Sequence, residues 1–141
     1  MFLLSNMLVL LVALLHIGFL VLEMFLWTHP IGMKVFRNTP EKAQMTRVLA
    51  ANQGLYNGFL AAGLVWSQLV YSAFFAFDIK IFFLSCVVLA ALFGTATVSR
   101  RILYVQGLPA IIALLMTMAF ANPYIGLDCC ARPQVAQLQV D

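Results

Sequence analysis

Residues 2–27, FLLSNMLVLLVALLHIGFLVLEMFLW, decide the fold because they form one long apolar run with a single charged residue, Glu23. The hydrocarbon core of a bilayer is about 30 Å thick and needs roughly 20 consecutive apolar residues to be crossed as a helix. The run is also far longer than the apolar core of a secretory signal, about 7–15 residues, and no basic segment precedes it. We therefore expect a retained membrane span over about residues 3–27.

The composition extends this expectation to the whole chain. Of the 141 residues, 64% are hydrophobic and 9% are charged, whereas a soluble domain has roughly 45–50% and 25%. This excludes a water-soluble globule and predicts an all-α, integral membrane four-helix bundle. The transmembrane domain is expected over residues 1–121, and residues 122–141 are expected to form a poorly ordered polar tail. The expected spans are about residues 3–27, 48–71, 80–97 and 102–121.

Local signals set the boundaries of these spans. Residues 28–32, THPIG, contain the breakers that end the first helix. Residues 39–41, TPE, restart a helix with a capping hydroxyl, a proline at the first helical position and an acid near the positive end of the helix dipole. A tight turn is expected around residues 77–79. Pro109 in the fourth span leaves the carbonyl of Val105 without its usual helical hydrogen bond, so that carbonyl needs another partner.

The basic residues predict the orientation. Six of the eight Lys and Arg residues fall in the first and third loops, and cytoplasmic loops are enriched in these residues. Both termini are therefore expected on the non-cytoplasmic side of the cell membrane, which is the inner membrane in a Gram-negative host. Nucleic acid is not an expected partner, because the bases lie in two short loops. The six are Lys34, Arg37, Lys42, Arg47, Arg100 and Arg101, and Lys80 and Arg132 lie on the other side.

Polar residues at membrane depth are costly, and they often face the interior of a bundle and mark function. His16 and Glu23 are seven residues apart and so share one face of the first helix. Counting residues from the cytoplasmic boundary places Glu23 and Asn52 at the same level. We therefore expect a polar pocket that opens toward the cytoplasm. Its candidate binding residues are Glu23, His16, Asn52, Gln53, Tyr56, Asn57 and Gln106.

Purely structural explanations exist for each of these residues. Glu23 can reach the lipid headgroups, and His16 can serve as a hydrogen-bond partner between helices. The polar run of residues 52–58 can act in helix packing alone. Gly54 and Gly58 form a GxxxG pattern, through which a homodimer is expected.

The sequence contains no motif for a metal or a cofactor, and none is expected. HExxH, paired CxxC, P-loop and GxSxG motifs are absent from the 141 residues. His16 and Glu23 are not at the i, i+4 spacing of a helical zinc site. Cys86 is interpreted as a packing residue, and no catalytic role is expected for Cys129 and Cys130.

Three stretches resemble a family of small bacterial and fungal membrane proteins, DUF1304. They are His16 with residues 22–27 (LEMFLW), residues 51–58 (ANQGLYNG) and residues 106–110 (QGLPA). The similarity covers about residues 5–120. It implies a four-helix membrane protein with no established biochemical role.

Three functions agree with these observations. The favoured one is the binding or transport of a small polar molecule, ion or lipid headgroup in the polar pocket. A second is a small membrane enzyme that acts on a lipid-soluble substrate, with Glu23 or His16 as acid or base. A third is an accessory subunit, in which the polar groups only hold helices together. The ligand, and the partner of such a subunit, remain unidentified.

Overall fold

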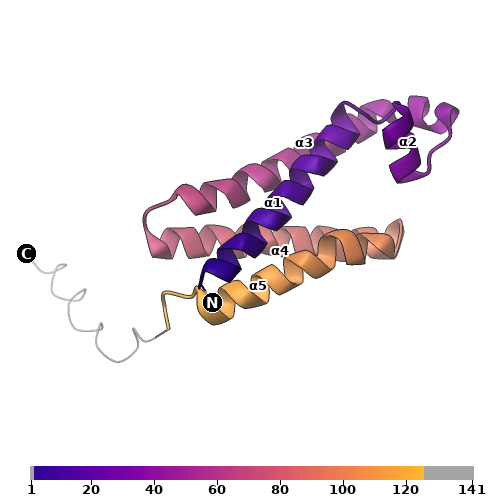
Figure 1. Cartoon of the computed structure of the whole chain (residues 1–141). Helices are drawn as coiled ribbons and strands as arrows, with labels where there is room; N and C mark the ends of the chain where they lie inside the picture. Colours follow the sequence, from indigo (N-terminus) through magenta and orange to yellow (C-terminus); the bar gives the residue numbers. More distant parts are fainter. Residues whose placement is uncertain (1, 126–141) are drawn as a thin grey trace, which may run out of the picture.

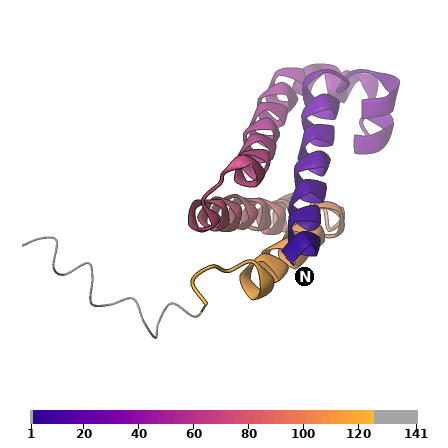
Figure 2. The ribbon, with the colours of Figure 1, turned by 60° about the vertical axis from the view of Figure 1, so that its left-hand side comes forward.

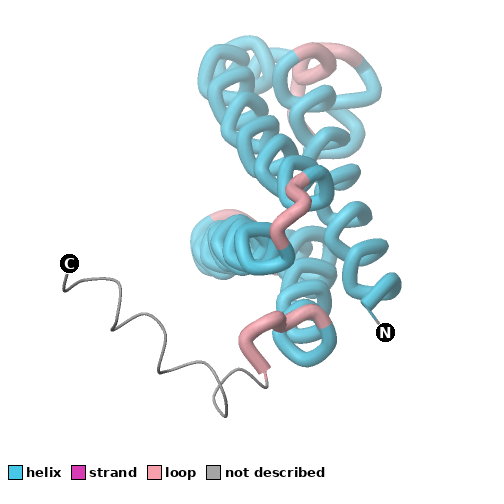
Figure 3. Tube along the Cα trace, turned by 90° about the vertical axis from the view of Figure 1, so that its left-hand side faces the viewer, coloured by secondary structure: helices cyan, strands magenta, loops and turns pink. Residues whose placement is uncertain are grey.

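The computed structural model describes residues 2–125, and every regular element in that range is helical (Figures 1 and 3). The expected all-α class is confirmed. Residues 126–141, which include most of the expected tail with Cys129, Cys130 and Arg132, lie outside the described part. The elements are α1 (Phe2–Met24), α2 (Pro30–Phe36), α3 (Pro40–Leu69), α4 (Ala73–Thr97), the π-helix η1 (Leu103–Gly107) and α5 (Leu108–Phe120).

Three helical segments are long and apolar enough to cross a membrane. They are Phe2–Met24, Ala73–Thr97 and the continuous stretch Leu103–Phe120. Helix α3 has 30 residues, but polar side chains in its first half lower its average hydropathy. By length and composition, the chain has the helices of a membrane protein.

The long helices pack in a fixed pattern. Helix α1 packs most extensively against α3 and also contacts α5, while α4 packs against α3, η1 and α5. Figures 1 and 2 show α1 crossing the other long helices at an angle. It lies against α3 near its C-terminal end and diverges from α3 toward its N-terminal end. The short helix α2 lies beside the C-terminal end of α1.

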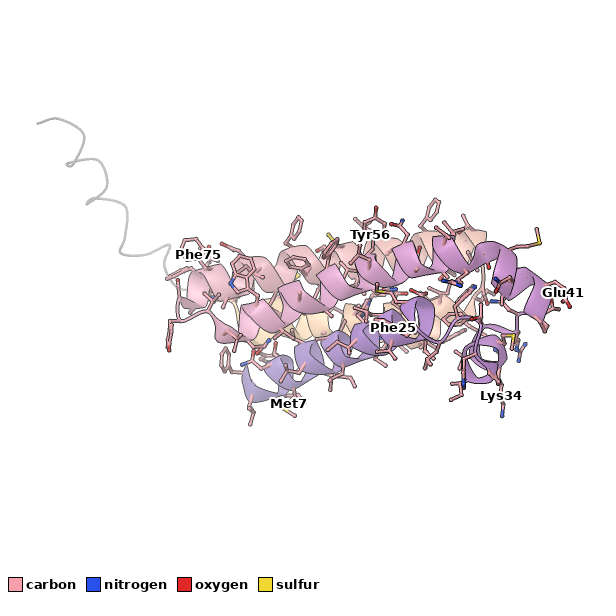
Figure 4. All side chains as sticks on the ribbon, turned by 90° about the horizontal axis from the view of Figure 1, so that it is seen from above. Met7, Phe25, Lys34, Glu41, Tyr56 and Phe75 are labelled. Atoms are coloured by element: carbon pink, nitrogen blue, oxygen red, sulfur yellow. The ribbon has the colours of Figure 1, made fainter. Side chains whose placement is uncertain are left out.

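The interior of the bundle contains mainly small and medium-sized apolar residues, and the large apolar side chains lie outside. Met7, Phe25, Tyr56 and Phe75 project from the bundle in Figure 4. Their exposed fractions range from 55% for Tyr56 to 69% for Phe25. Small residues at helix contacts and apolar residues on the outside suit a lipid environment. The central core consists of Val9, Val12, Ala13, Leu64, Leu84, Val87, Ala110 and Ala113.

Some boundaries follow the sequence signals and others do not. Helix α3 begins at Pro40 as expected, and the Thr39 hydroxyl accepts a hydrogen bond from the Lys42 amide at 3.3 Å. The turn expected at residues 77–79 was wrong, because the chain turns at residues 70–72 and α4 already begins at Ala73. Helix α2 was not anticipated, since Pro30 was interpreted as a breaker although proline is well suited to the first helical position.

The expected defect at Pro109 appears as the π-helix η1. Within it the backbone hydrogen bonds shift from i, i+4 to i, i+5, so that the Leu108 amide bonds to the Leu103 carbonyl. Single π-helical turns inside α-helices are rare and frequently lie at functional sites. Gly107 allows this turn to approach α4, since a Cβ there would lie 3.2 Å from the Cβ of Ala91.

Replacing Gly32 by alanine tests the docking of α2. A Cβ at Gly32 would overlap the backbone carbonyl of Leu26, so α2 must move away from the turn that follows α1. We expect Gly32→Ala to lower the free energy of unfolding by about 1–3 kcal/mol, as overpacking does. It should also change the fluorescence of Trp27, whose indole nitrogen donates to the Thr46 hydroxyl at 3.0 Å.

Gly18→Ala is the matched control. A Cβ at Gly18 meets no atom within 4 Å, so this change should leave stability unchanged or slightly raised. Unfolding in mixed detergent micelles measures the stability of both variants. Equal effects at the two glycines would contradict the tight contact of Gly32 with Leu26.

Candidate functional site

A hydrogen bond between Glu23 and Asn57 is the polar contact at the crossing of α1 and α3. The Asn57 amide nitrogen, Nδ2, donates to Oε2 of Glu23 at 2.7 Å. Both side chains are buried, with exposed fractions of 9% for Glu23 and 7% for Asn57. A buried carboxyl is costly unless hydrogen bonds replace its hydration. Asn57 supplies one such bond, and Oε1 of Glu23 has no protein donor among residues 2–125.

Two glycines bring the helices close enough for this bond. Gly54 and Gly58 flank Asn57 on α3, and a Cβ at Gly54 would lie 2.7 Å from Cγ of Met24 and 3.1 Å from the Met24 amide. A Cβ at Gly58 would lie 2.5 Å from Cδ1 of Leu20. The two glycines therefore serve packing within one chain. The expected homodimer through Gly54 and Gly58 stays a prediction, and it would have to compete with α1 for this face.

His16 lies on the same face of α1 and is fully buried. Its Nδ1 lies 2.8 Å from the Val12 carbonyl, which can only accept, so Nδ1 carries the proton. The other nitrogen, Nε2, is buried and has no hydrogen-bond partner among residues 2–125. Seven residues separate His16 from Glu23, which is about 10.5 Å along a helix at 1.5 Å per residue. The two groups are thus too far apart to hold one reacting atom between them.

The remaining predicted residues do not gather around Glu23. Asn52, Gln53 and Tyr56 lie on exposed faces of α3, and Gln106 is half-buried in η1. Successive residues of a helix point about 100° apart, so a polar run of seven residues covers nearly all sides of α3. Asn57 alone of that run bonds to Glu23 in the described structure. The described structure therefore does not bring all seven residues together around Glu23, and their roles in binding stay predictions.

The groove between α1 and α3 is apolar. It has a volume of about 410 Å³ and lies between α1 and the second half of α3. At its narrow end Leu20 meets Gly58. Glu23 is one helical turn beyond Leu20, and Asn57 directly precedes Gly58. The groove is lined by Ile17, Leu20, Gly58, Ala61, Ala62, Val65, Trp66 and Leu69.

A second polar layer at the N-terminal end of α1 was not anticipated. The Lys80 ammonium donates to Oδ1 of Asn6 at 2.7 Å, and the hydroxyls of Ser5 and Thr117 lie 2.9 Å apart. Lys80 is 4% exposed, and both hydroxyl residues are fully buried. The signal was present in the sequence, because Ser5 and Asn6 interrupt an apolar run and Lys80 interrupts an apolar helix.

The two polar layers are separated by the apolar core. Val9, Val12 and Ala13 lie between Asn6 and His16 on α1 and pack against Leu64 and Ala110. Within residues 2–125, these buried apolar side chains interrupt the polar groups along α1. The arrangement supports separate sites at its two ends better than one continuous pathway.

No metal site is apparent in residues 2–125, where no group of three or more His, Cys, Asp or Glu side chains is close enough to hold an ion.

Outside the spans, the hydrogen bond that the Tyr124 hydroxyl donates to Oδ2 of Asp78 at 2.9 Å raises the pKa of Tyr124.

Comparison with known proteins agrees with the resemblance found in the sequence. A family model described as a protein of unknown function, DUF1304, matches residues 10–118. The uncharacterized protein YpaA of Lactococcus lactis subsp. lactis (strain IL1403) is 34% identical over 117 residues, which are 82% of this chain and 97% of that protein. No solved structure matches.

Removing the amide of Asn57 tests the polar contact. Asn57→Ala leaves the buried Glu23 carboxyl without its donor, and we expect a loss of about 1–2 kcal/mol in the free energy of unfolding. Glu23→Gln keeps a side-chain carbonyl that accepts the bond, so it should cost less.

Asn52→Ala is the control on the same helix, because Asn52 is exposed and makes no hydrogen bond to Glu23 within residues 2–125. Its stability should stay near that of the wild type in the same detergent titration. If both asparagine variants lose the same stability, the buried bond does not hold α1 to α3.

Proposed function

The chain belongs to the DUF1304 family, whose function is unknown, and we propose that it binds a lipid-soluble molecule that carries one amine or hydroxyl group. The observation that carries this proposal is the apolar groove between α1 and α3, whose narrow end lies one helical turn from the buried Glu23 carboxyl. An apolar cleft with a few placed polar groups is the usual form of a small-molecule site.

The chemistry of the site's two parts, the apolar groove and the Glu23 carboxyl, defines the ligand class. Ala61, Val65 and Trp66 offer only apolar contact to the body of a ligand. Oε1 of Glu23 has no protein donor in the described structure, so it can accept a hydrogen bond from a ligand. An ammonium supplies both the donor and the opposite charge, which matters most where water is scarce. We therefore expect amines to bind more tightly than alcohols, and carboxylic acids to be rejected.

In this proposal Leu20 controls whether a ligand in the groove can reach the Glu23 carboxyl. Its side chain contacts Gly58 and lines the groove, and Leu20 is one helical turn before Glu23 on α1. A change of rotamer at Leu20 would let the polar group of a ligand reach the carboxyl. In this proposal the binding energy comes mainly from the groove, and Glu23 selects the head of the molecule.

The same proposal places four crossings in the membrane, with α3 as the second. Polar contacts bring the start of α1 beside α4 and the end of α5, and residues 70–72 join the end of α3 to α4. The basic loops lie at the opposite end, where Figure 4 shows both Lys34 and Glu41. We place that end in the cytoplasm and both termini outside.

Filling the groove tests the binding site. Ala62 lines the groove but is exposed, so Ala62→Phe occupies the groove without disturbing the core. Binding of dodecylamine, dodecanol and dodecanoate is measured by native mass spectrometry of the full chain. We expect wild type to prefer the amine, Ala62→Phe to weaken binding of amine and alcohol alike, and Glu23→Gln to abolish the preference for the amine.

Ala96→Phe, on an exposed position of α4 away from the groove, serves as the matched control. It should bind all three probes as the wild type does. Equal binding of dodecanoate and dodecylamine, or equal binding by the Ala62→Phe variant, would overturn the proposal.

Labelling of single cysteines tests the crossing by α3. In a background with all three native cysteines replaced by serine, Arg37→Cys and Tyr71→Cys flank the expected crossing. A membrane-impermeant maleimide added to intact cells should label Tyr71→Cys but label Arg37→Cys only after the cells are opened. Labelling of both positions from one side would show that α3 does not cross.

A further inference from the structure

We propose that Lys80 and Asn6 form a second binding site, for an oxyanion such as a phosphate or carboxylate, at the outer end of the bundle. The site joins α4 to the second turn of α1 through the 2.7 Å bond from Nζ of Lys80 to Oδ1 of Asn6. It is independent of the groove and of Glu23, because the apolar core lies between them.

The first argument is the missing counter-charge. Lys80 is 4% exposed, and no carboxylate pairs with it within residues 2–125. The described carboxylates are engaged or remote, since Glu23 bonds to Asn57 and Asp78 to Tyr124, while Glu41 lies near the cytoplasmic loops. Asp78 is two residues from Lys80, and residues at this spacing do not face each other on a helix. A buried ammonium with one neutral partner favours an added anion.

The second argument is the type of hydrogen-bonding group that remains. An ammonium has three N–H groups, and one of them is used by Asn6. The carboxamide oxygen of Asn6 is occupied by that bond, so its NH₂ group is what it can offer to a ligand. Asn6 is half-buried and can be reached from outside. Lys80 and Asn6 together thus present several unused donors, which suit a group with several acceptor oxygens.

The depth of the site agrees with a ligand at the membrane surface. The Lys80 ammonium lies 5.7 Å from the centre of the Phe2 ring, at the first residue of α1. Asn6 is in the second turn of α1, so the site lies near the end of that helix. The oxyanion could belong to a lipid headgroup or to a soluble ion, and the two sources share this chemistry.

Phosphate probes test the site in the full-length protein in dodecyl maltoside. We expect dodecyl phosphate to bind the wild type and to raise its unfolding temperature. Lys80→Met should weaken this binding by at least about tenfold, the value of one charge-assisted hydrogen bond. Lys34→Met, which removes an exposed base at the opposite end, should bind as the wild type does.

A second variant keeps the test decisive if Lys80→Met folds poorly. Asn6→Asp supplies a carboxylate within reach of Lys80, so it should preserve the fold and abolish phosphate binding. Binding of inorganic phosphate with equal affinity would identify a soluble ion, and binding of dodecyl phosphate alone would identify a lipid. The proposal fails if neither probe binds the wild type, or if Asn6→Asp binds phosphate as tightly as the wild type.

Discussion

The close approach of α1 and α3 at Gly54 and Gly58 is the constraint on which the rest of the structure depends. Without side chains at these two positions, α3 lies directly against Met24 and Leu20 of α1. A bond as short as the one from Asn57 to Glu23 requires this proximity. Because α1 crosses α3 at an angle, contact at this point forces the helices apart farther along (Figure 2). The polar contact and the apolar groove therefore have one geometric cause.

The sequence predicted the features that depend on composition and local signals. The all-α class, the start of α3 at Pro40 and a defect before Pro109 follow from apolar run lengths, a capping threonine and the missing proline amide. The turn between α3 and α4 was placed seven residues too late because Asp78 was interpreted as a turn residue. In the structure Asp78 lies within α4 and bonds to Tyr124, a contact between distant residues that local signals cannot show.

The site was predictable only in part, because it too depends on contacts between residues that are distant in the sequence. Glu23 and His16 were recognised because they share one buried face of α1. The partner of Glu23 could not be chosen among Asn52, Gln53, Tyr56 and Asn57, because that choice depends on the rotation of α3 about its axis. The glycines fix this rotation, since only their side of α3 can approach α1 closely, and Asn57 lies between them. Interpreting the GxxxG pattern as a contact within the chain would have selected Asn57.

The distribution of polar groups along α1 bears on what this small bundle can do. Asn6 and Glu23 lie near opposite ends of the helix and bond to different helices, α4 and α3. His16 lies between them with Nε2 unpartnered, but Val9 and Val12 separate it from Asn6. A proton or ion moving along the bundle would have to cross this apolar layer, whose described side chains cannot replace its hydration. Two sites that act separately need no such route, and the packing between them then serves only to hold the helices at fixed positions.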